Sequence, residues 1–160
     1  MNLKPLIAKQ QAFDQALAEA HQIKTKTWIE PALLALYVEV GELANEIQSF
    51  KYWKKNKRIV LARVQEEYAD GLHFLLSFLN EFPGTTELPA QVVSHNVNQQ
   101  FLAMFRALHA LQSDFQAAHV HQAFSIYLGL GHLLNLAEAD ILAAYEQKNQ
   151  INFERIKNNY

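Results

Sequence analysis

Two acidic motifs, about one helix apart, hold the residues of this sequence that are best suited to chemistry. The first is Glu39-Val-Gly-Glu42, with Glu46 one turn further on, and the second is Glu67-Tyr-Ala-Asp70. Carboxylates three or four residues apart share one side of a helix. At about 100° per residue, Glu39, Glu42 and Glu46 fall within an arc of roughly 60°. Both motifs border an apolar stripe, so we expect their carboxylates to point into a groove between two helices.

Carboxylates that converge in such a groove need either protons or a cation. Two of them about 4 Å apart, at an effective dielectric constant near 20, repel each other by roughly 4 kcal/mol. The sequence has no Cys, and hard oxygen ligands favour Mg²⁺ or Mn²⁺. A lone E-x-x-E motif more often lies on a solvated helix face. Here two such motifs lie on consecutive helices, both beside an apolar stripe. A metal site and a solvated face are therefore about equally supported.

A second cluster lies near the end of the sequence. Lys148, Asn152 and Arg155 follow one another at spacings of four and three, so they share one helix face. An ammonium, an amide and a forked guanidinium together suit the binding of a polyphosphate. The alternative is an ordinary polar helix at the end of the chain, and composition alone favours it.

A basic connector joins the two acidic segments, with the sequence Lys51-Tyr-Trp-Lys-Lys-Asn-Lys-Arg58. An aromatic ring such as that of Trp53 can stack on a nucleobase while lysines contact phosphate. A solvated loop anchored by its tryptophan is the simpler alternative.

The elements that must position these residues are helices. Only five Gly and four Pro are present, and no segment alternates convincingly as a strand. We expect an all-α bundle of four core helices plus additional helices, in one domain over residues 1–160. The expected helices run from about Leu3 to Lys24, Glu30 to Phe50, Ile59 to Glu81, His95 to Gln112, Phe115 to Leu134, and from a start capped by Asn135 to about Lys157.

Composition excludes several classes of protein. Half of the 160 residues are hydrophobic, which argues against disorder. A net charge of −2 argues against broad nucleic-acid binding, and no apolar run reaches the roughly 18 residues of a membrane helix. The lack of Cys and of an apolar leader after Met1 fits a cytoplasmic protein.

With these clusters in place, the sequence resembles the dimeric dUTPase family, a branch of the all-α NTP pyrophosphatases that also include MazG-like proteins. The resemblance rests on E-x-x-E followed, after twenty-four residues, by E-x-x-D. It extends to the surrounding segments Glu42-Leu-Ala-Asn-Glu46, Phe50-Lys-Tyr-Trp-Lys54 and Asp70-Gly-Leu-His-Phe74. The final motif, Tyr145-x-x-Lys148-Asn149-x-x-Asn152-x-x-Arg155, and Gln11-Ala-Phe-Asp14 near the start also match. Asp14 stands where other members carry Asn.

The resemblance implies hydrolysis of dUTP, and also of dUDP, with two or three Mg²⁺ ions held by Glu39, Glu42, Glu67 and Asp70. Either Glu42 or Glu46 would accept a proton from the attacking water. The other implied roles concern the substrate. Its phosphates would meet Lys148, Arg155 and Lys51, its pyrimidine Gln11, Asp14 and Trp53, and its sugar or phosphates Asn149 and Asn152.

The family also implies a homodimer. The apolar character of residues 101–111 and 124–134 favours the same conclusion, because helices this apolar are usually enclosed on most sides. Two other readings stay open at this point. One is a pyrophosphatase of the same fold acting on another nucleotide, such as dCTP or a damaged one. The other is a helical interaction protein without catalysis.

Overall fold

The structure is a computed structural model that describes residues 3–23 and 26–158. These residues form six α-helices and contain no β-strand. The predicted all-α class is therefore confirmed. No helix among these residues is long and apolar enough to cross a bilayer. The elements are α1 (Lys4–Ala20), the 3-10 helix η1 (Lys26–Trp28), α2 (Ile29–Ile47), α3 (Leu61–Glu81), α4 (Val97–Ser113), α5 (Ala117–Leu133) and α6 (Glu138–Lys157).

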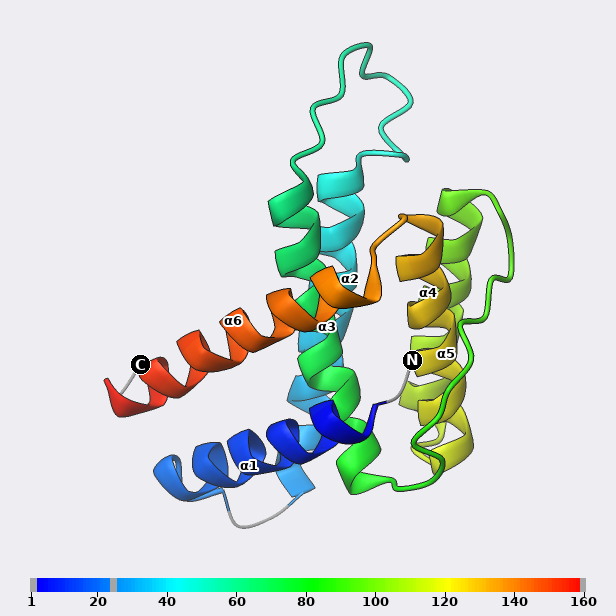
Figure 1. The fold of residues 1–160 in the computed structure, drawn as a ribbon. Helices are drawn as coiled ribbons and strands as arrows, with labels where there is room; N and C mark the ends of the chain where they lie inside the picture. Colours follow the sequence, from blue (N-terminus) through cyan, green and yellow to red (C-terminus); the bar gives the residue numbers. More distant parts are fainter. Residues whose placement is uncertain (1–2, 24–25, 159–160) are drawn as a thin grey trace.

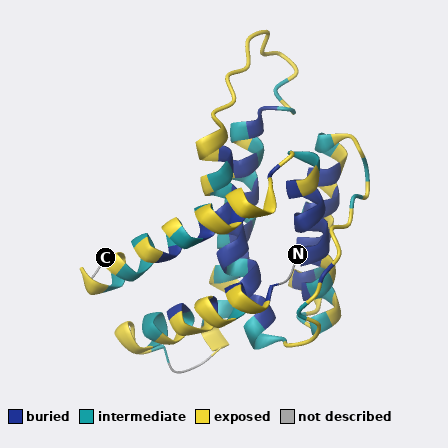
Figure 2. Ribbon diagram, in the orientation of Figure 1, coloured by how far each residue is buried: buried dark blue, intermediate teal, exposed yellow. Residues whose placement is uncertain are grey.

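Helix α3 is the centre of the fold. It contacts α1, α2, α5 and α6, and ten of its residues are buried. In Figure 1, α2 and α3 form one pair, α4 and α5 form a second pair beside it, and α1 and α6 extend on the other side. Burial is concentrated on α3 and on the inner sides of α4 and α5, whereas the ends of α1 and α6 are exposed (Figure 2). The acidic motif on α3 is thus held by the best-packed helix.

A reciprocal tyrosine pair fixes α3 against α5. The Tyr68 hydroxyl donates to the Tyr127 carbonyl oxygen at 3.1 Å, and the Tyr127 hydroxyl donates to the Tyr68 carbonyl oxygen at 2.9 Å. The two rings stack with centroids 4.5 Å apart. Gly71 leaves room for this contact, because a Cβ atom there would lie 2.2 Å from the Tyr127 hydroxyl oxygen. The backbone beside Asp70 is therefore held in place.

Helix α2 ends three residues earlier than predicted. Gln48 takes a left-handed conformation (φ 57°), and its N–H donates to the carbonyl oxygen of Ala44. The Gln48 side chain donates to the Arg58 carbonyl oxygen at 2.8 Å and accepts from Lys54 Nζ at 2.7 Å. The predicted continuation to Phe50 is wrong because these contacts hold both arms of the connector against the helix end.

The predicted role of Asn135 is also wrong. It does not cap the start of α6, whose N-cap is Ala137. Asn135 instead follows the end of α5 in the left-handed conformation (φ 54°). Its N–H donates to the His132 carbonyl oxygen, and the N–H of Leu136 donates to the Gly131 carbonyl oxygen. This is the usual geometry of an Asn or Gly after a helix C-terminus, and sequence alone did not separate the two uses of Asn.

The other helices agree with the predictions to within about two residues, except at the end of α1. That helix stops at Ala20, where Gln22 turns left-handed (φ 54°), and the predicted end at Lys24 lies outside the described residues. Helix α4 begins after Asn96, whose side chain accepts from the N–H of Gln99. Pro31 stands in the first turn of α2, as expected for a residue without a backbone N–H.

Helices α4 and α5 do not support the argument for a dimer that their composition suggested. Most of their large apolar residues are buried within a single chain, among them Phe101, Met104, Leu108, Phe124 and Leu130. The exposed apolar side chains lie mainly elsewhere, on α2 and the connector.

Candidate active site

A large cleft, of about 950 Å³, opens between α1, α2, α3 and α6. Its lining residues come from these four helices, from η1 and from His21 and Ile23 just after α1, and none come from α4 or α5. Nine of the predicted site residues line it: Gln11, Asp14, Glu39, Glu42, Glu67, Asp70, Lys148, Asn152 and Arg155. The cleft has an acidic end beside α2 and a mostly apolar end beside α1.

The acidic end brings together the two motifs of the sequence. Glu39, Glu67 and Asp70 each offer a carboxylate oxygen within 4.8 Å of the others. Glu42 also lines the cleft, and its side chain is hydrogen-bonded to that of Glu67. Two carboxylates can share a hydrogen bond only when one carries a proton, so a cation has a ready place here.

Burial and mutual repulsion raise the pKa values of this cluster. Loss of hydration, followed by the charges of Asp70, Glu42 and Glu67, raises the pKa of Glu39 to about 7. Loss of hydration and the neighbouring Glu42 and Asp70 likewise raise the pKa of Glu67 to about 7. Burial raises the pKa of Asp70 as well, although Lys148 opposes that change.

The donor set fits hard divalent cations. All of its ligand atoms are carboxylate oxygens, which suit Mg²⁺ and Mn²⁺ and not softer metals. Burial and the neighbouring carboxylates both disfavour the charged form of this cluster, and a bound divalent ion would offset that cost.

Lys148 brings a cation into contact with this cluster. Its Nζ atom lies 2.7 Å from Asp70 Oδ2 and 3.2 Å from Glu66 Oε1. The side chain is 13% exposed, so the ammonium is held between α6 and α3. Arg155, two turns further along α6, donates to Asn152 Oδ1 at 3.3 Å, and both residues line the cleft.

The other end of the cleft carries a polar network that the sequence analysis only partly anticipated. Asp14 accepts hydrogen bonds from Gln10 Nε2 (2.8 Å), Ser77 Oγ (2.8 Å) and Asn80 Nδ2 (3.4 Å). Gln10 and His73 are buried, whereas the predicted Gln11 is exposed at the rim. Burial raises the pKa of Asp14 even though these donors oppose the change.

Helical spacing could have revealed the missed residues. His73, Ser77 and Asn80 continue the face of α3 that begins with Glu67 and Asp70, at steps of three, four and three. Gln10 precedes Asp14 by one turn of α1. The His73 ring is hydrogen-bonded to Gln10 and stacks on Tyr145 with ring centroids 4.4 Å apart.

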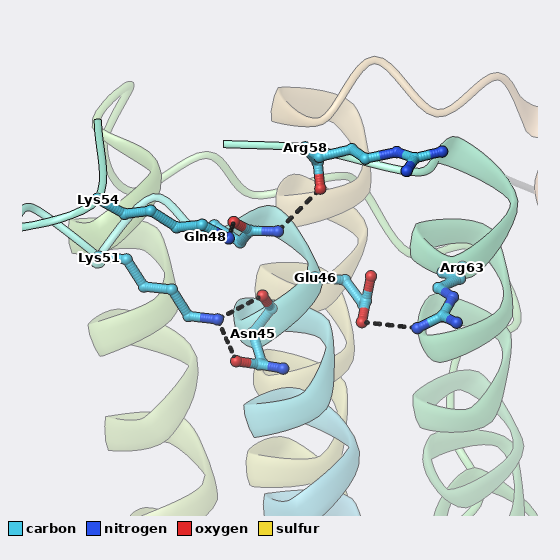
Figure 3. A network of polar contacts seen from close by, with 7 residues as sticks. All are labelled: Asn45, Glu46, Gln48, Lys51, Lys54, Arg58 and Arg63. Atoms are coloured by element: carbon cyan, nitrogen blue, oxygen red, sulfur yellow. Dashed lines mark hydrogen bonds and ion pairs between the residues drawn. The ribbon is translucent and has the colours of Figure 1, made fainter. Parts of the chain in front are cut away.

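Four predicted site residues lie outside this cleft. Glu46 faces Arg63, 3.8 Å away, and Lys51 donates to the Asn45 carbonyl oxygen at 3.3 Å, beyond the end of α2 (Figure 3). Trp53, 62% exposed, lies in the connector with its edge against Phe50 and Tyr52. Asn149 is buried and does not line the cleft. The tryptophan that does line it is Trp28, stacked on Phe78.

The site thus combines acidic groups on two consecutive helices with a lysine from a third, in an all-helical protein. Comparison with known families gives the assignment. The model of the family described as dUTPase matches residues 2–160, nearly the whole chain. The chain belongs to this family, the dimeric all-α dUTPases, whose members are metal-dependent pyrophosphatases, and it is an enzyme of the dUTP diphosphatase type. No curated protein sequence matched the chain.

The raised pKa values predict an unusual pH dependence of stability. An acid whose pKa is about 7 when folded, against 4.5 ordinarily, stabilises the fold below pH 4.5 and loses that contribution as the pH rises through 7. In EDTA, the melting temperature of wild type relative to Glu67→Gln should therefore fall between pH 5 and pH 8. Saturating Mg²⁺ at pH 8 should restore it. An equal difference at both pH values in EDTA would contradict the assignment.

Proposed function

We propose that the enzyme hydrolyses dUTP to dUMP and pyrophosphate, and dUDP to dUMP and phosphate, with Mg²⁺ as cofactor. The observation that carries this proposal is the continuity of one cleft, from the carboxylate cluster, past Lys148, to a pocket with apolar walls and a polar floor. A triphosphate nucleotide has the same sequence of parts: phosphates, sugar and a flat base.

At the acidic end, Glu39, Glu42, Glu67 and Asp70 would hold two or three Mg²⁺ ions, with Mn²⁺ as a possible substitute. Bound there, such ions withdraw charge from phosphate oxygens and lower the pKa of water. A water oxygen forms a bond to phosphorus at the α–β anhydride, the bridging P–O bond breaks, and pyrophosphate leaves. Lys148 and Arg155 stabilise the negative charge of the phosphates.

The proton of the attacking water needs an acceptor, and the structure favours Glu42 over Glu46. Glu42 is exposed to the cleft, whereas Glu46 is turned toward Arg63 and does not line it. A general base must come within hydrogen-bond reach of the proton that it takes. We therefore propose Glu42 for this role.

The base would lie at the other end of the cleft, against Phe13, Phe74 and Trp28. Gln11 and Asp14 are proposed to meet the pyrimidine edge, and Asn152 the sugar or the phosphates. Asn149, Lys51 and Trp53 stay predictions as substrate ligands. The last two act at this cleft only if their connector, or that of a second subunit, reaches it.

A screen of pyrophosphate release from all common NTPs and dNTPs, with Mg²⁺ or Mn²⁺, tests this function. We expect dUTP to be among the best substrates and EDTA to abolish turnover. The reading as a pyrophosphatase for another nucleotide would be favoured if a purine nucleotide were the best substrate and dUTP were inert.

We further propose that the enzyme is a cytoplasmic homodimer. Exposed apolar side chains lie on one side of α2, at Leu34 (66% exposed) and Val38 (49% exposed), and in the connector at Phe50 and Trp53. An isologous contact through α2 would remove this surface from water.

Light scattering should therefore give twice the chain mass of 18.3 kDa at micromolar concentration. The double variant Leu34→Glu/Val38→Glu should give a monomer, because each change places a charge in the proposed contact. The matched change Leu102→Glu, on exposed apolar surface of α4, should leave the mass unchanged. A wild-type monomer would contradict the proposal.

A further inference from the structure

The polar network around Asp14 lies at the end of the cleft that is proposed to bind the base. Asp14 determines which groups in this network donate hydrogen bonds and which accept them. A carboxylate can only accept hydrogen bonds. Gln10 must therefore turn its Nε2 toward Asp14 Oδ1 (2.8 Å), which turns its Oε1 the other way. That oxygen accepts from the Tyr145 hydroxyl at 2.9 Å and lies 2.7 Å from His73 Nδ1.

The tautomer of His73 follows from this direction. Because Gln10 Oε1 can only accept, His73 Nδ1 must carry the hydrogen, and Nε2 is left with a lone pair. Burial lowers the pKa of His73 to about 4, so the ring is neutral at pH 7. His73 Nε2 is buried and has no hydrogen-bond partner among the described residues. This side of the network thus offers no donor.

The donors of the network are all used within it. Gln10 Nε2 donates its two hydrogens to Asp14 Oδ1 and to Ser77 Oγ, which is 3.0 Å away. The single hydrogen of Ser77 goes to Asp14 or to the His73 carbonyl oxygen. Asn80 Nδ2 is directed to Asp14 Oδ2 and to the Ile7 carbonyl oxygen. What remains for a ligand is acceptor capacity, chiefly at Asp14 Oδ2, whose one described contact is the long one to Asn80.

A cleft wall that offers only hydrogen-bond acceptors limits which bases the site can exclude. Uracil presents an N3–H between two carbonyl oxygens, and cytosine presents an amino group at position 4. To reject cytosine, a site needs a fixed donor facing position 4, because two donors that face each other leave both unpaired. Gln11, at the exposed rim, can turn either end of its amide to the base and so does not discriminate.

We infer that this cleft hydrolyses dCTP as well as dUTP, with Asp14 as the residue that admits the cytosine amino group. The inference rests on the proposed function, since it assumes that the base of a nucleotide lies against Asp14. The chemistry is unchanged: water adds at phosphorus, the P–O bond of the α–β anhydride breaks, and dCMP and pyrophosphate leave.

The isosteric variant Asp14→Asn tests the inference. Its Oδ1 atom would keep the hydrogen bonds from Gln10 and Ser77, so its new NH₂ group would face the cleft as a donor. We expect wild-type kcat/KM values for dUTP and dCTP within about tenfold of each other, and a shift toward dUTP of at least about tenfold in the variant. The control is Asp114→Asn, the same change at the exposed end of α4, which should leave the ratio unaltered.

The outcomes separate this inference from the function on which it rests. Hydrolysis of dUTP with dCTP more than about a thousandfold poorer would overturn the inference and leave the proposed function intact. Hydrolysis of neither nucleotide would overturn both. An unchanged ratio in Asp14→Asn would show that Asp14 does not read the base.

A second measurement does not depend on activity. In ¹⁵N spectra of histidine-labelled protein at pH 7, the His73 signals, assigned by their loss in His73→Gln, should show hydrogen on Nδ1 and a bare Nε2. Asp14→Asn should keep this preference, because its Oδ1 atom would still accept from Gln10 Nε2 and so hold Gln10 in the same orientation. Hydrogen on Nε2 of His73 in the wild type would overturn the direction that the inference assigns to the network.

Discussion

Replacing Asp70 by Asn, or Glu42 by Gln, is expected to abolish turnover while leaving the fold intact. Each change keeps the shape of the side chain and removes one negative charge from the cluster that would hold the cations. Losing one preorganised electrostatic group from an active site costs about 10² to 10³ in kcat. A residue that both holds a metal and takes a proton should lie at the upper end of this range.

Glu42→Gln should lower turnover without lowering the stability of the metal-free protein. Burial, and after it the charges of Glu42 and Asp70, raise the pKa values of Glu39 and Glu67, so removing the charge of Glu42 relieves repulsion in the protein without metal. In EDTA at pH 8, the melting temperature of Glu42→Gln should equal or exceed that of wild type. The stabilisation by Mg²⁺ should shrink in both variants.

Glu46→Gln is the matched control, because Glu46 lies one turn beyond Glu42 on the same helix but pairs with Arg63 outside the cleft. We expect its kcat within about threefold of wild type, since surface pairs of this kind contribute little. Steady-state pyrophosphate release and circular dichroism on all three variants are sufficient. Near-wild-type activity in both Glu42→Gln and Asp70→Asn would refute the metal site.

The acidic half of the cleft could be predicted from the sequence because a helix converts spacing into position. Glu39, Glu42, Glu67 and Asp70 stand at steps of three on two helices, and α2 and α3 lie side by side. The periodicity of each apolar stripe fixed the side on which the carboxylates emerge. Only the partner helix, α6, with Lys148, had to be inferred from a separate cluster.

The apolar end of the cleft was harder to predict because its polar residues are amides and hydroxyls that are wholly or partly buried. Gln10 and Ser77 have no charge or motif that marks them, and their importance comes from contacts across 63 to 135 residues of sequence. Gln11, one residue away, is exposed at the rim, so neighbouring positions on α1 differ between a buried and a solvated amide.

The connector shows why composition alone does not place a residue at the cleft. Lys51 and Trp53 have the composition of a nucleotide-binding segment, but composition says nothing about where a loop is tethered. Gln48 holds the connector through Lys54 and the Arg58 carbonyl oxygen, beyond the ends of α2 and α3 (Figure 3). Within one chain, these contacts hold the basic connector away from the cleft, although its composition is typical of a nucleotide-binding segment.

Replacing Lys148 by Met is expected to weaken triphosphate binding far more than it weakens the fold. The ammonium lies 2.7 Å from Asp70 and 3.2 Å from Glu66, so it partly neutralises the acidic cluster until phosphates compete for it. Charge-assisted hydrogen bonds of this kind contribute about 1.5–3 kcal/mol, or roughly tenfold to a hundredfold in affinity. Arg155→Ala should act in the same direction, because the guanidinium lines the same wall of the cleft.

The measurement is calorimetric titration with a non-hydrolysable dUTP analogue in Mg²⁺, set beside thermal unfolding of each variant. Lys9→Ala is the control, because Lys9 pairs with Glu146 between the same helices, α1 and α6, but does not line the cleft. It should alter neither affinity nor the response to Mg²⁺. In Lys148→Met, Mg²⁺ should raise the melting temperature by more than it does in wild type, since Asp70 has lost the cation beside it. Wild-type affinity in the Lys148 and Arg155 variants would show that the phosphates lie elsewhere.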